Sequence, residues 1–174
     1  MGLIEDLLGH LFPPATESVA TLMRGRRATV RGRVVARDLL ESPVHGVRCV
    51  YYRTLIEEWR ASSVIGPIGG GGFWTVIEQD EAIAEFSIQD ESGRALVAPE
   101  RARVNTGAAF APKALGGGRR AAEQVIRDGD LVEIEGLVEE VDDLLDEGLG
   151  YRAPRKAPVL RAPEGGVLRV RVVR

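Results

Sequence analysis

The fold is decided by the stretch Phe86-Ser87-Ile88-Gln89-Asp90-Glu91-Ser92-Gly93-Arg94-Ala95-Leu96-Val97. Apolar and polar residues alternate on either side of its centre, which is the pattern of a strand that buries one face. The centre, Asp90-Glu91-Ser92-Gly93, has the acidic first residue and the glycine last residue that tight turns favour. The stretch therefore predicts a hairpin of two short strands over residues 83–89 and 94–98.

Further strands are expected on both sides of this hairpin. Alternating or largely apolar segments indicate strands at residues 28–37, 47–60, 73–78, 131–139 and 167–173. The last two strands carry their charges on one face, glutamate on the first and arginine on the second: Glu133, Glu135, Arg169 and Arg171. If these strands are neighbours, opposite charges pair across the sheet. The strands together predict a mainly β fold, a five- to six-stranded antiparallel barrel.

Short helices and loops are expected around the barrel. Residues 2–12 have apolar side chains at helical spacing and are stopped by Pro13-Pro14. A second helix is expected to begin after Thr16 and to end at Gly25, and a third to span residues 120–127. We therefore expect two parts, an N-terminal amphipathic helical segment over residues 1–25 and a barrel domain over residues 26–174. Flexible glycine-rich loops are expected at residues 61–72 and 101–118, and a mobile excursion at 144–166.

Composition limits the classes of protein that are compatible with the chain. The 174 residues suit one domain, and the formal charge of −3 gives no overall attraction to nucleic acid or to anionic membranes. A single cysteine, Cys49, excludes an intramolecular disulfide. The N-terminal residues lack the pattern of a signal peptide, and no segment approaches the ~20 apolar residues that span a bilayer. These features predict a soluble, cytoplasmic protein without integral insertion in a membrane.

Several short phrases lie in order over residues 28–140, and they include Gly32-Arg33-Val34, Cys49-Val50-Tyr51-Tyr52-Arg53, Glu57-Glu58, Phe86 through Asp90, Gly93 through Val97, and Glu123. Together these phrases resemble the GIDE-type domain, also called the beside-a-membrane domain, of membrane-anchored organellar ubiquitin ligases and their prokaryotic relatives. The positions that match the family motif, which we expect to be structural, are Ser42, Pro43, Cys49, Tyr51, Tyr52, Trp74, Asp90, Gly93, Gly129, Asp130 and Gly136. The resemblance is consistent with a barrel related to the OB fold.

The activity of the ligases does not carry over to this sequence. Members of the family usually have transmembrane helices, and the ligases have a RING finger, and this sequence has neither. A structural zinc site needs four Cys or His ligands, whereas the chain offers only Cys49, His10 and His45. We therefore expect no metal and no cofactor.

Catalytic chemistry is not indicated by any group of residues. Ser42, His45 and Asp38 lie in one segment, but nothing in the sequence indicates the pocket in which a nucleophile, a base and an oxyanion site converge. Cys49 lies within an expected strand, where cysteine is usually a small buried hydrophobe, and the alternative is a reactive thiol. The glycine run at 69–72 lacks the Gly-Lys-Ser/Thr ending of a phosphate-binding loop, and the run before Arg119-Arg120 is expected to be a loop.

We therefore expect a non-catalytic protein-interaction or adaptor module. The candidate partner-binding residues are the apolar side chains of the N-terminal helix, Leu3, Leu7, Leu8, Leu11 and Phe12. This helix packs on its own barrel, mediates self-association or binding to a protein partner, or lies on a membrane. One alternative function is single-stranded nucleic-acid binding, since OB-like barrels bind strands through a basic groove with exposed aromatic residues. A second is a peripheral membrane-associated accessory protein. The sequence does not identify the partner, the oligomeric state or the cellular process.

Overall fold

The computed structural model describes residues 15–62, 71–107, 109–142 and 156–173. The chain forms two compact units. Unit 1 is built from residues 1–37, 85–105 and 129–174, and unit 2 from residues 38–84 and 106–128. Unit 2 therefore consists of two separate excursions of the chain, each of which begins and ends in unit 1.

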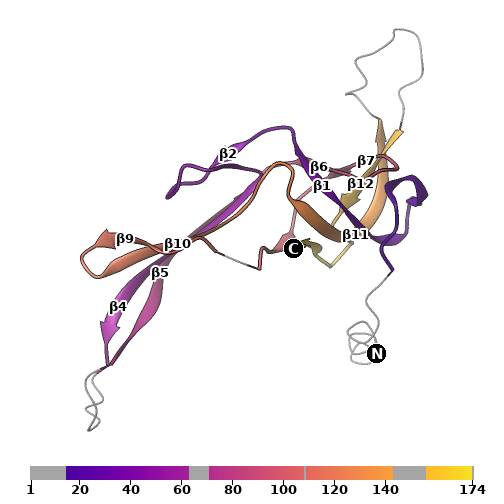
Figure 1. The fold of residues 1–174 in the computed structure, drawn as a ribbon. Helices are drawn as coiled ribbons and strands as arrows, with labels where there is room; N and C mark the ends of the chain where they lie inside the picture. The colour runs from indigo at the N-terminus through magenta and orange to yellow at the C-terminus, as the bar shows by residue number, and fades with distance from the viewer. Residues whose placement is uncertain (1–14, 63–70, 108, 143–155, 174) are drawn as a thin grey trace. The chain divides into compact units, whose positions relative to one another are not determined.

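Unit 1 contains a closed five-stranded barrel (Figure 1). Its strands, in chain order, are β1 (Arg27–Ala36), β6 (Phe86–Gln89), β7 (Arg94–Val97), β11 (Leu131–Asp142) and β12 (Lys156–Arg161). They lie in the order β1-β6-β7-β12-β11, and β11 pairs with β1 to close the barrel. All pairs in the barrel are antiparallel except β7–β12. Numbered along the chain, the barrel strands follow the order 1-2-3-5-4-1.

Two more strands extend the barrel sheet beyond β11. β13 (Leu168–Val172) pairs antiparallel with β11, and β8 (Ala102–Asn105) pairs parallel with β13. The expected charge pairing is confirmed, because β11 and β13 are neighbours and place Glu133 opposite Arg171 and Glu135 opposite Arg169.

The barrel interior is filled by aliphatic and aromatic side chains from every strand. Each of the following is at most 1% exposed: Val30, Val34, Phe86, Ile88, Ala95, Val97, Val132, Ile134, Val138, Leu160, Leu168 and Val170. The alternation of apolar and polar residues thus matches the inward and outward faces of the strands. Gly32 allows the backbone of β1 to lie close to that of β6, since a Cβ at this position would lie 2.5 Å from the carbonyl oxygen of Gln89.

The expected hairpin turn is confirmed at Asp90. The carboxylate Oδ1 of Asp90 accepts hydrogen bonds from the backbone N–H groups of Ser92 (2.7 Å) and Gly93 (2.9 Å), and Oδ2 accepts one from the N–H of Val19 (2.7 Å). Burial raises the pKa of Asp90, but these three hydrogen bonds and a fourth from the Ser92 hydroxyl lower it by more. The pKa of Asp90 therefore lies below its usual value. The turn therefore also anchors the segment before β1.

Unit 2 contains a four-stranded antiparallel sheet in the order β5-β4-β10-β9 (Figure 1). Its strands are β4 (Tyr51–Ala61), β5 (Gly72–Ile83), β9 (Lys113–Gly116) and β10 (Arg119–Ile126). The short strands β2 (Leu40–Glu41) and β3 (Arg48–Cys49) form a separate pair in the same unit. β4 and β5 pair along their whole lengths, with one bulge at Ile77, where Ile56 lies opposite Glu78 but Glu57 lies opposite Val76.

The expected helices are not found in the described part of the chain. The segment from Thr16 to Gly25 has only one 3₁₀ turn, η1 (Val19–Thr21), and a bridge between Glu17 and Val30. Instead of the expected helix over residues 120–127, residues 120–126 belong to strand β10, because β10 pairs with β4 and β9 and this pairing outweighs the helix propensity of Ala, Glu and Gln. The expected helix over residues 2–12 lies outside the described residues.

Two expected loops also contain strands. The segment 101–118 contains β8 and β9, and the segment 144–166 contains β12, which is the fifth strand of the barrel. A proline is unusual inside a sheet, so Pro158 argued against a strand here. Pro158 lies where β12 pairs with β11 alone, so its missing N–H removes no hydrogen bond to a second neighbouring strand. One pair in the barrel, β7–β12, is parallel, which corrects the expected all-antiparallel arrangement.

Candidate functional site

Glu123 on β10 is the centre of the most extensive polar cluster in unit 2. Its side chain is fully buried and accepts hydrogen bonds at both oxygens. Oε2 accepts from the Ser42 hydroxyl (2.8 Å), from His45 Nδ1 (2.9 Å) and from the His45 N–H (3.2 Å). Oε1 accepts from the Val44 N–H (3.0 Å) and the Thr54 hydroxyl (3.0 Å). Five donors therefore satisfy one buried carboxylate.

These bonds fix the segment 42–47 on the sheet, and we call Glu123 together with this segment the clamp. Burial raises the pKa of Glu123, but the hydrogen bonds from Val44, Ser42, His45 and Thr54 outweigh it, so the pKa lies below its usual value. The carboxyl group is therefore charged near neutral pH, and it holds a segment that lies about 80 residues earlier in the chain. Ser42 completes the clamp, because its Oγ also accepts the N–H of Val47 (3.0 Å).

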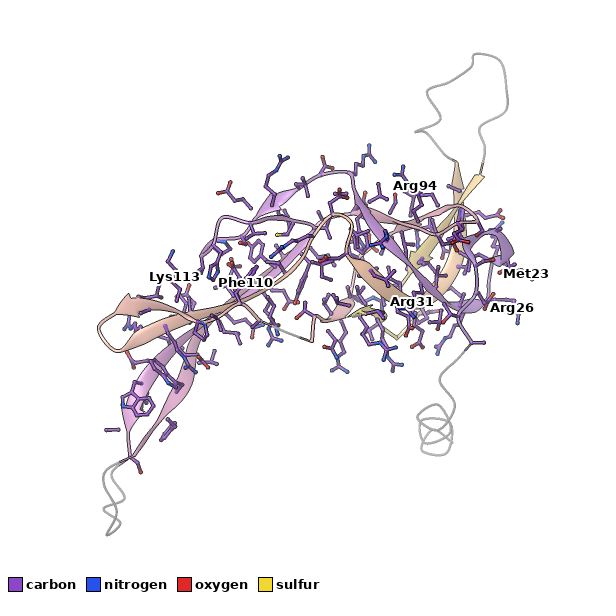
Figure 2. All side chains as sticks on the ribbon, viewed as in Figure 1. Met23, Arg26, Arg31, Arg94, Phe110 and Lys113 are labelled. Carbon is purple, nitrogen blue, oxygen red and sulfur yellow. The ribbon has the colours of Figure 1, made fainter. Side chains whose placement is uncertain are left out.

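The geometry of Ser42 and His45 differs from that of a nucleophile and its base. Both side chains bond to Glu123, and within the described residues no hydrogen bond joins Ser42 to His45. Asp38, the third polar residue of this segment, is exposed and does not contact the pair through a hydrogen bond. The His45 ring instead packs against Phe110, with ring centroids 4.9 Å apart, and the Arg127 guanidinium lies 5.2 Å from the centre of the Phe110 ring. Figure 2 labels Phe110 and Lys113, which lie along the β9–β10 side of unit 2.

A hollow of about 320 Å³ lies next to this clamp on the same face of the sheet. Pro43, Val44 and Ile56 form apolar parts of its lining, and Glu78 and Asp80 of β5 add two carboxylates. Lys113 also lines it and donates from Nζ to the carbonyl oxygen of Val44 (3.1 Å). The described residues contain no group of three or more His, Cys, Asp or Glu that is arranged to hold a metal ion.

Large apolar side chains are exposed at the distal part of β4 and β5. We call this region the hairpin patch, and it consists of the exposed Trp59, Phe73, Val76 and Ile77 and the half-buried Trp74. Trp59, Trp74 and Val76 share one face of the strand pair, and Phe73 lies on the opposite face. Phe73 is 58% exposed and Trp59 is 47% exposed. The Trp59 and Trp74 rings meet edge to face, with centroids 5.4 Å apart, and the Arg120 guanidinium lies 4.1 Å from the centre of the Trp74 ring. The aromatic part of the patch is therefore held in a defined orientation.

The cations around the hairpin patch are paired with carboxylates. Arg120 bonds Glu57 (2.6 Å), and Glu58 accepts from both Arg119 (3.2 Å) and Arg60 (3.3 Å). Among the described residues of this region, three guanidiniums are thus partly neutralised by two carboxylates.

Cations are also paired with carboxylates on the outer face of β11 and β13 in unit 1. Arg171 bonds Glu133 (2.6 Å), and Arg169 bonds Glu135 (3.1 Å). A second hollow of about 210 Å³ opens beside β6, β7 and β12, with an apolar floor that includes Leu96 and Val159.

The family-motif positions are distributed over both units. In unit 2, the Tyr51 hydroxyl donates a hydrogen bond to Glu81 and the Tyr52 hydroxyl donates one to Asp80, and both donor–acceptor distances are 3.0 Å. Burial, followed by the bond to Glu81, raises the pKa of Tyr51 far above its usual value. Cys49 is fully buried, as its position in a strand predicted, and burial raises the pKa of its thiol. Ser42 and Pro43 belong to the clamped segment, and Trp74 to the hairpin patch.

The remaining motif positions shape turns and the wall of unit 1. Gly129 has a φ of +82°, and its N–H donates to the carbonyl oxygen of Val34 (2.8 Å), while the carbonyl oxygen of Asp130 accepts from the N–H of Val34 (2.9 Å). A Cβ at Gly136 would lie 2.6 Å from Leu168 Cδ1. Asp90 and Gly93 form the hairpin turn described above. The five candidate partner-binding residues of the N-terminal segment lie outside the described residues.

Sequence reasoning missed the role of Glu123 and the hairpin patch. Glu123 was expected on a helix, and a glutamate among Ala, Arg and Gln gives no signal of burial. The stretch Ala121 to Ile126 places like residues side by side and does not alternate between apolar and polar, so the two-residue period of a strand is not visible there.

Comparisons with known proteins identify no relative. No family model, no curated protein and no solved structure matches this chain. In the described part of the chain, no helix is long and apolar enough to cross a membrane.

Proposed function

We propose that this protein is a non-catalytic protein-interaction module, and that it binds its partner through the hairpin patch of unit 2. The observation that carries this proposal is the exposure of four apolar side chains on two adjacent strands: Trp59 and Val76 on the face of Trp74, Phe73 on the opposite face, and Ile77 at the bulge. Isolated exposed apolar residues are common, but a contiguous apolar group that contains aromatic rings is typical of an interaction surface.

The composition and rigidity of the patch favour a protein as the partner. Trp and Arg are the residue types that most often dominate the binding energy of protein interfaces. Trp59, Trp74 and Arg120 contact one another before any partner binds, so little side-chain entropy remains to be lost on association.

Nucleic-acid binding through this surface is less favoured, although exposed tryptophans also stack on bases. Single-strand binding needs a positively charged track beside the aromatic rings. Here the arginines next to the rings are paired with Glu57 and Glu58, and the arginines of β13 are paired with glutamates of β11. The charge that would attract phosphates is largely cancelled at both places.

The strand order of the barrel supports the proposed relationship to the OB fold. An order of 1-2-3-5-4-1 with a parallel pair between the third and fifth strands is a closed Greek-key arrangement of five strands. A GIDE-type domain and a role for the N-terminal segment in self-association remain proposals that rest on the sequence. Fold alone does not define a partner, so the proposed function depends on the hairpin patch.

The proposal is tested by affinity capture from the cells that produce this protein. Wild-type protein is compared with Trp59→Ser plus Phe73→Ser, and with Val167→Ser, which removes an exposed apolar side chain from unit 1. We expect wild type and Val167→Ser to retain the same specific protein, and the double variant to lose it while circular dichroism shows an unchanged β signal. Retention of that protein by the double variant, or capture of nucleic acid alone, would contradict the proposal.

A further inference from the structure

Strand β5 presents a long unpaired edge in unit 2. It is twelve residues long, it lies at the end of the strand order β5-β4-β10-β9, and it pairs only with β4 among the described residues. Every second residue of such an edge directs its N–H and C=O groups away from the sheet. An edge of this length is a template for another extended segment.

The side chains of β5 divide the edge into two halves of different chemistry. The first half, Gly72 to Ile77, contains the apolar residues of the hairpin patch, and the second half contains the acidic run Glu78-Gln79-Asp80-Glu81. Within β4, the cross-strand neighbour of Glu78 is Ile56 and that of Asp80 is Thr54. Neither neighbour is a cation.

Other groups near the acidic half leave most of its charge in place. Asp80 and Glu81 accept hydrogen bonds from the hydroxyls of Tyr52 and Tyr51, which are neutral. Arg53 lies opposite Glu81, and Lys113 lines the same hollow as Glu78 and Asp80 but donates to a backbone carbonyl. The acidic half thus keeps a net negative charge.

This charge discriminates between possible occupants of the edge. A second copy of β5 paired along the full edge in antiparallel register would bring the acidic half of one copy towards the apolar half of the other, leaving its carboxylates without cations. The expected N-terminal apolar segment of the chain carries Glu5 and Asp6 and no lysine or arginine before Arg24. A segment with basic residues is complementary to the edge, because opposite charges across strands are stabilising and like charges are destabilising.

We infer that β5 binds an extended segment of a partner protein as an additional antiparallel strand, with lysine or arginine beside Glu78 to Glu81 and apolar residues beside Phe73 to Val76. This inference rests on the proposed function and specifies the partner and the mode of binding. The added strand takes its affinity from main-chain hydrogen bonds and its selectivity from side chains, as in other cases of strand addition. The bulge at Ile77 lies where the two halves meet and exposes that side chain to 40%.

The test uses a fluorescent twelve-residue peptide and the full protein. The peptide has the sequence Thr-Lys-Val-Lys-Thr-Lys-Val-Thr-Val-Thr-Val-Thr, so that antiparallel pairing places its lysines beside the acidic half. Two further versions carry N-methyl groups on alternate residues, one on the odd positions and the other on the even positions. Only one of these sets removes the N–H groups that face β5. A fourth peptide has glutamate in place of each lysine. Fluorescence polarisation measures the four dissociation constants.

We expect one N-methylated peptide to lose binding at least tenfold and the other to bind within about threefold of the parent. We also expect Glu78→Lys to weaken the lysine peptide about tenfold, which corresponds to about 1.4 kcal/mol, and to strengthen the glutamate peptide. The matched control, Glu164→Lys, makes the same charge change at an exposed position of unit 1 and should have less than a twofold effect.

Four results would overturn the inference: no binding of the lysine peptide at millimolar concentration, equal loss with both N-methylated peptides, binding of both N-methylated peptides like the parent, or equal effects of Glu78→Lys and Glu164→Lys. These failures are separate from a failure of the proposed function. If both N-methylated peptides bind like the parent while Trp59→Ser plus Phe73→Ser still loses the captured protein, the hairpin patch binds through side chains and β5 does not accept a strand.

Discussion

Replacement of Glu123 is expected to destabilise unit 2 more than replacement of any exposed acidic residue. In Glu123→Gln, the amide oxygen can keep the three donors at the Oε2 position, and the Thr54 hydroxyl can reverse to accept from the amide. The N–H of Val44 then loses its acceptor, and one unsatisfied buried donor costs about 1–3 kcal/mol. In Glu123→Leu, all five donors lose their acceptor, and we expect a loss of about 3–5 kcal/mol, the range for a broken buried charged network.

Tryptophan fluorescence during urea unfolding measures the free energy of unfolding of unit 2. Both tryptophans of the chain, Trp59 and Trp74, belong to unit 2, so the signal does not report on the barrel of unit 1. The control is Glu78→Gln, an exposed carboxylate with no hydrogen bond in the described part of the chain, for which we expect a change within about 0.5 kcal/mol. A loss below about 1 kcal/mol for Glu123→Leu would refute the assignment of Glu123 as the centre of the clamp.

The stability that Glu123 contributes to the fold should depend on pH with a defined sign. The folded pKa of Glu123 is lower than its usual value of 4.5, so its ionised form is favoured by folding. The resulting stabilisation is fully present above pH 4.5 and is lost as the pH falls through the folded pKa. The free-energy difference between wild type and Glu123→Gln should therefore be constant near neutral pH and decrease in acid. A difference that grows as the pH falls would contradict this argument.

Four further predictions concern other parts of the molecule. Gly32→Ala should destabilise the barrel by about 1–3 kcal/mol in calorimetry because the new Cβ overlaps a backbone carbonyl, whereas Gly71→Ala, with open space around it, should be neutral. Cys49 should react with iodoacetamide only as fast as unit 2 opens, since its thiol is buried and its pKa is raised; rapid alkylation of the folded protein would show an accessible thiol. Single-stranded DNA should bind weakly in a filter assay and be released at physiological salt, because the exposed arginines of β13 are paired; salt-resistant submicromolar binding would favour the nucleic-acid alternative. Leu7→Asp plus Leu11→Asp should leave the barrel folded and lower the oligomeric state seen by light scattering, and a wild type that is already monomeric would show that these leucines have another role.

The sequence predicted the parts of the fold that depend on local chemistry. The turn at Asp90 requires only residues within four positions of one another, and the alternation in β1, β11 and β13 is visible in each strand separately. The facing of Glu133 and Arg171 was also accessible, because complementary charges on two strands suggest that they are neighbours. The turn and the alternation can be recognised without knowledge of the rest of the chain.

The features that sequence reasoning missed depend on distant partners. Strand β10 has the composition of a helix, and only pairing with β4 and β9 makes it a strand. Similarly, β12 is short and contains a proline, but Val159 and Leu160 complete the barrel wall beside β7. The clamp at Glu123 joins residues that are 69 to 81 positions apart, so no local pattern identifies the carboxylate as buried.

The interleaved paths of the two units have a consequence for synthesis on the ribosome. Unit 2 cannot assemble its sheet when residues 38–84 emerge, because β10 is not yet made, and the barrel cannot close when β1 emerges, because β11 and β12 come about 100 residues later. The edge of β1 that pairs with β11 and the edge of β4 that pairs with β10 therefore leave the ribosome before these partners exist. A chain with such late partners is expected to fold slowly after release, and to require protection from aggregation during its own translation.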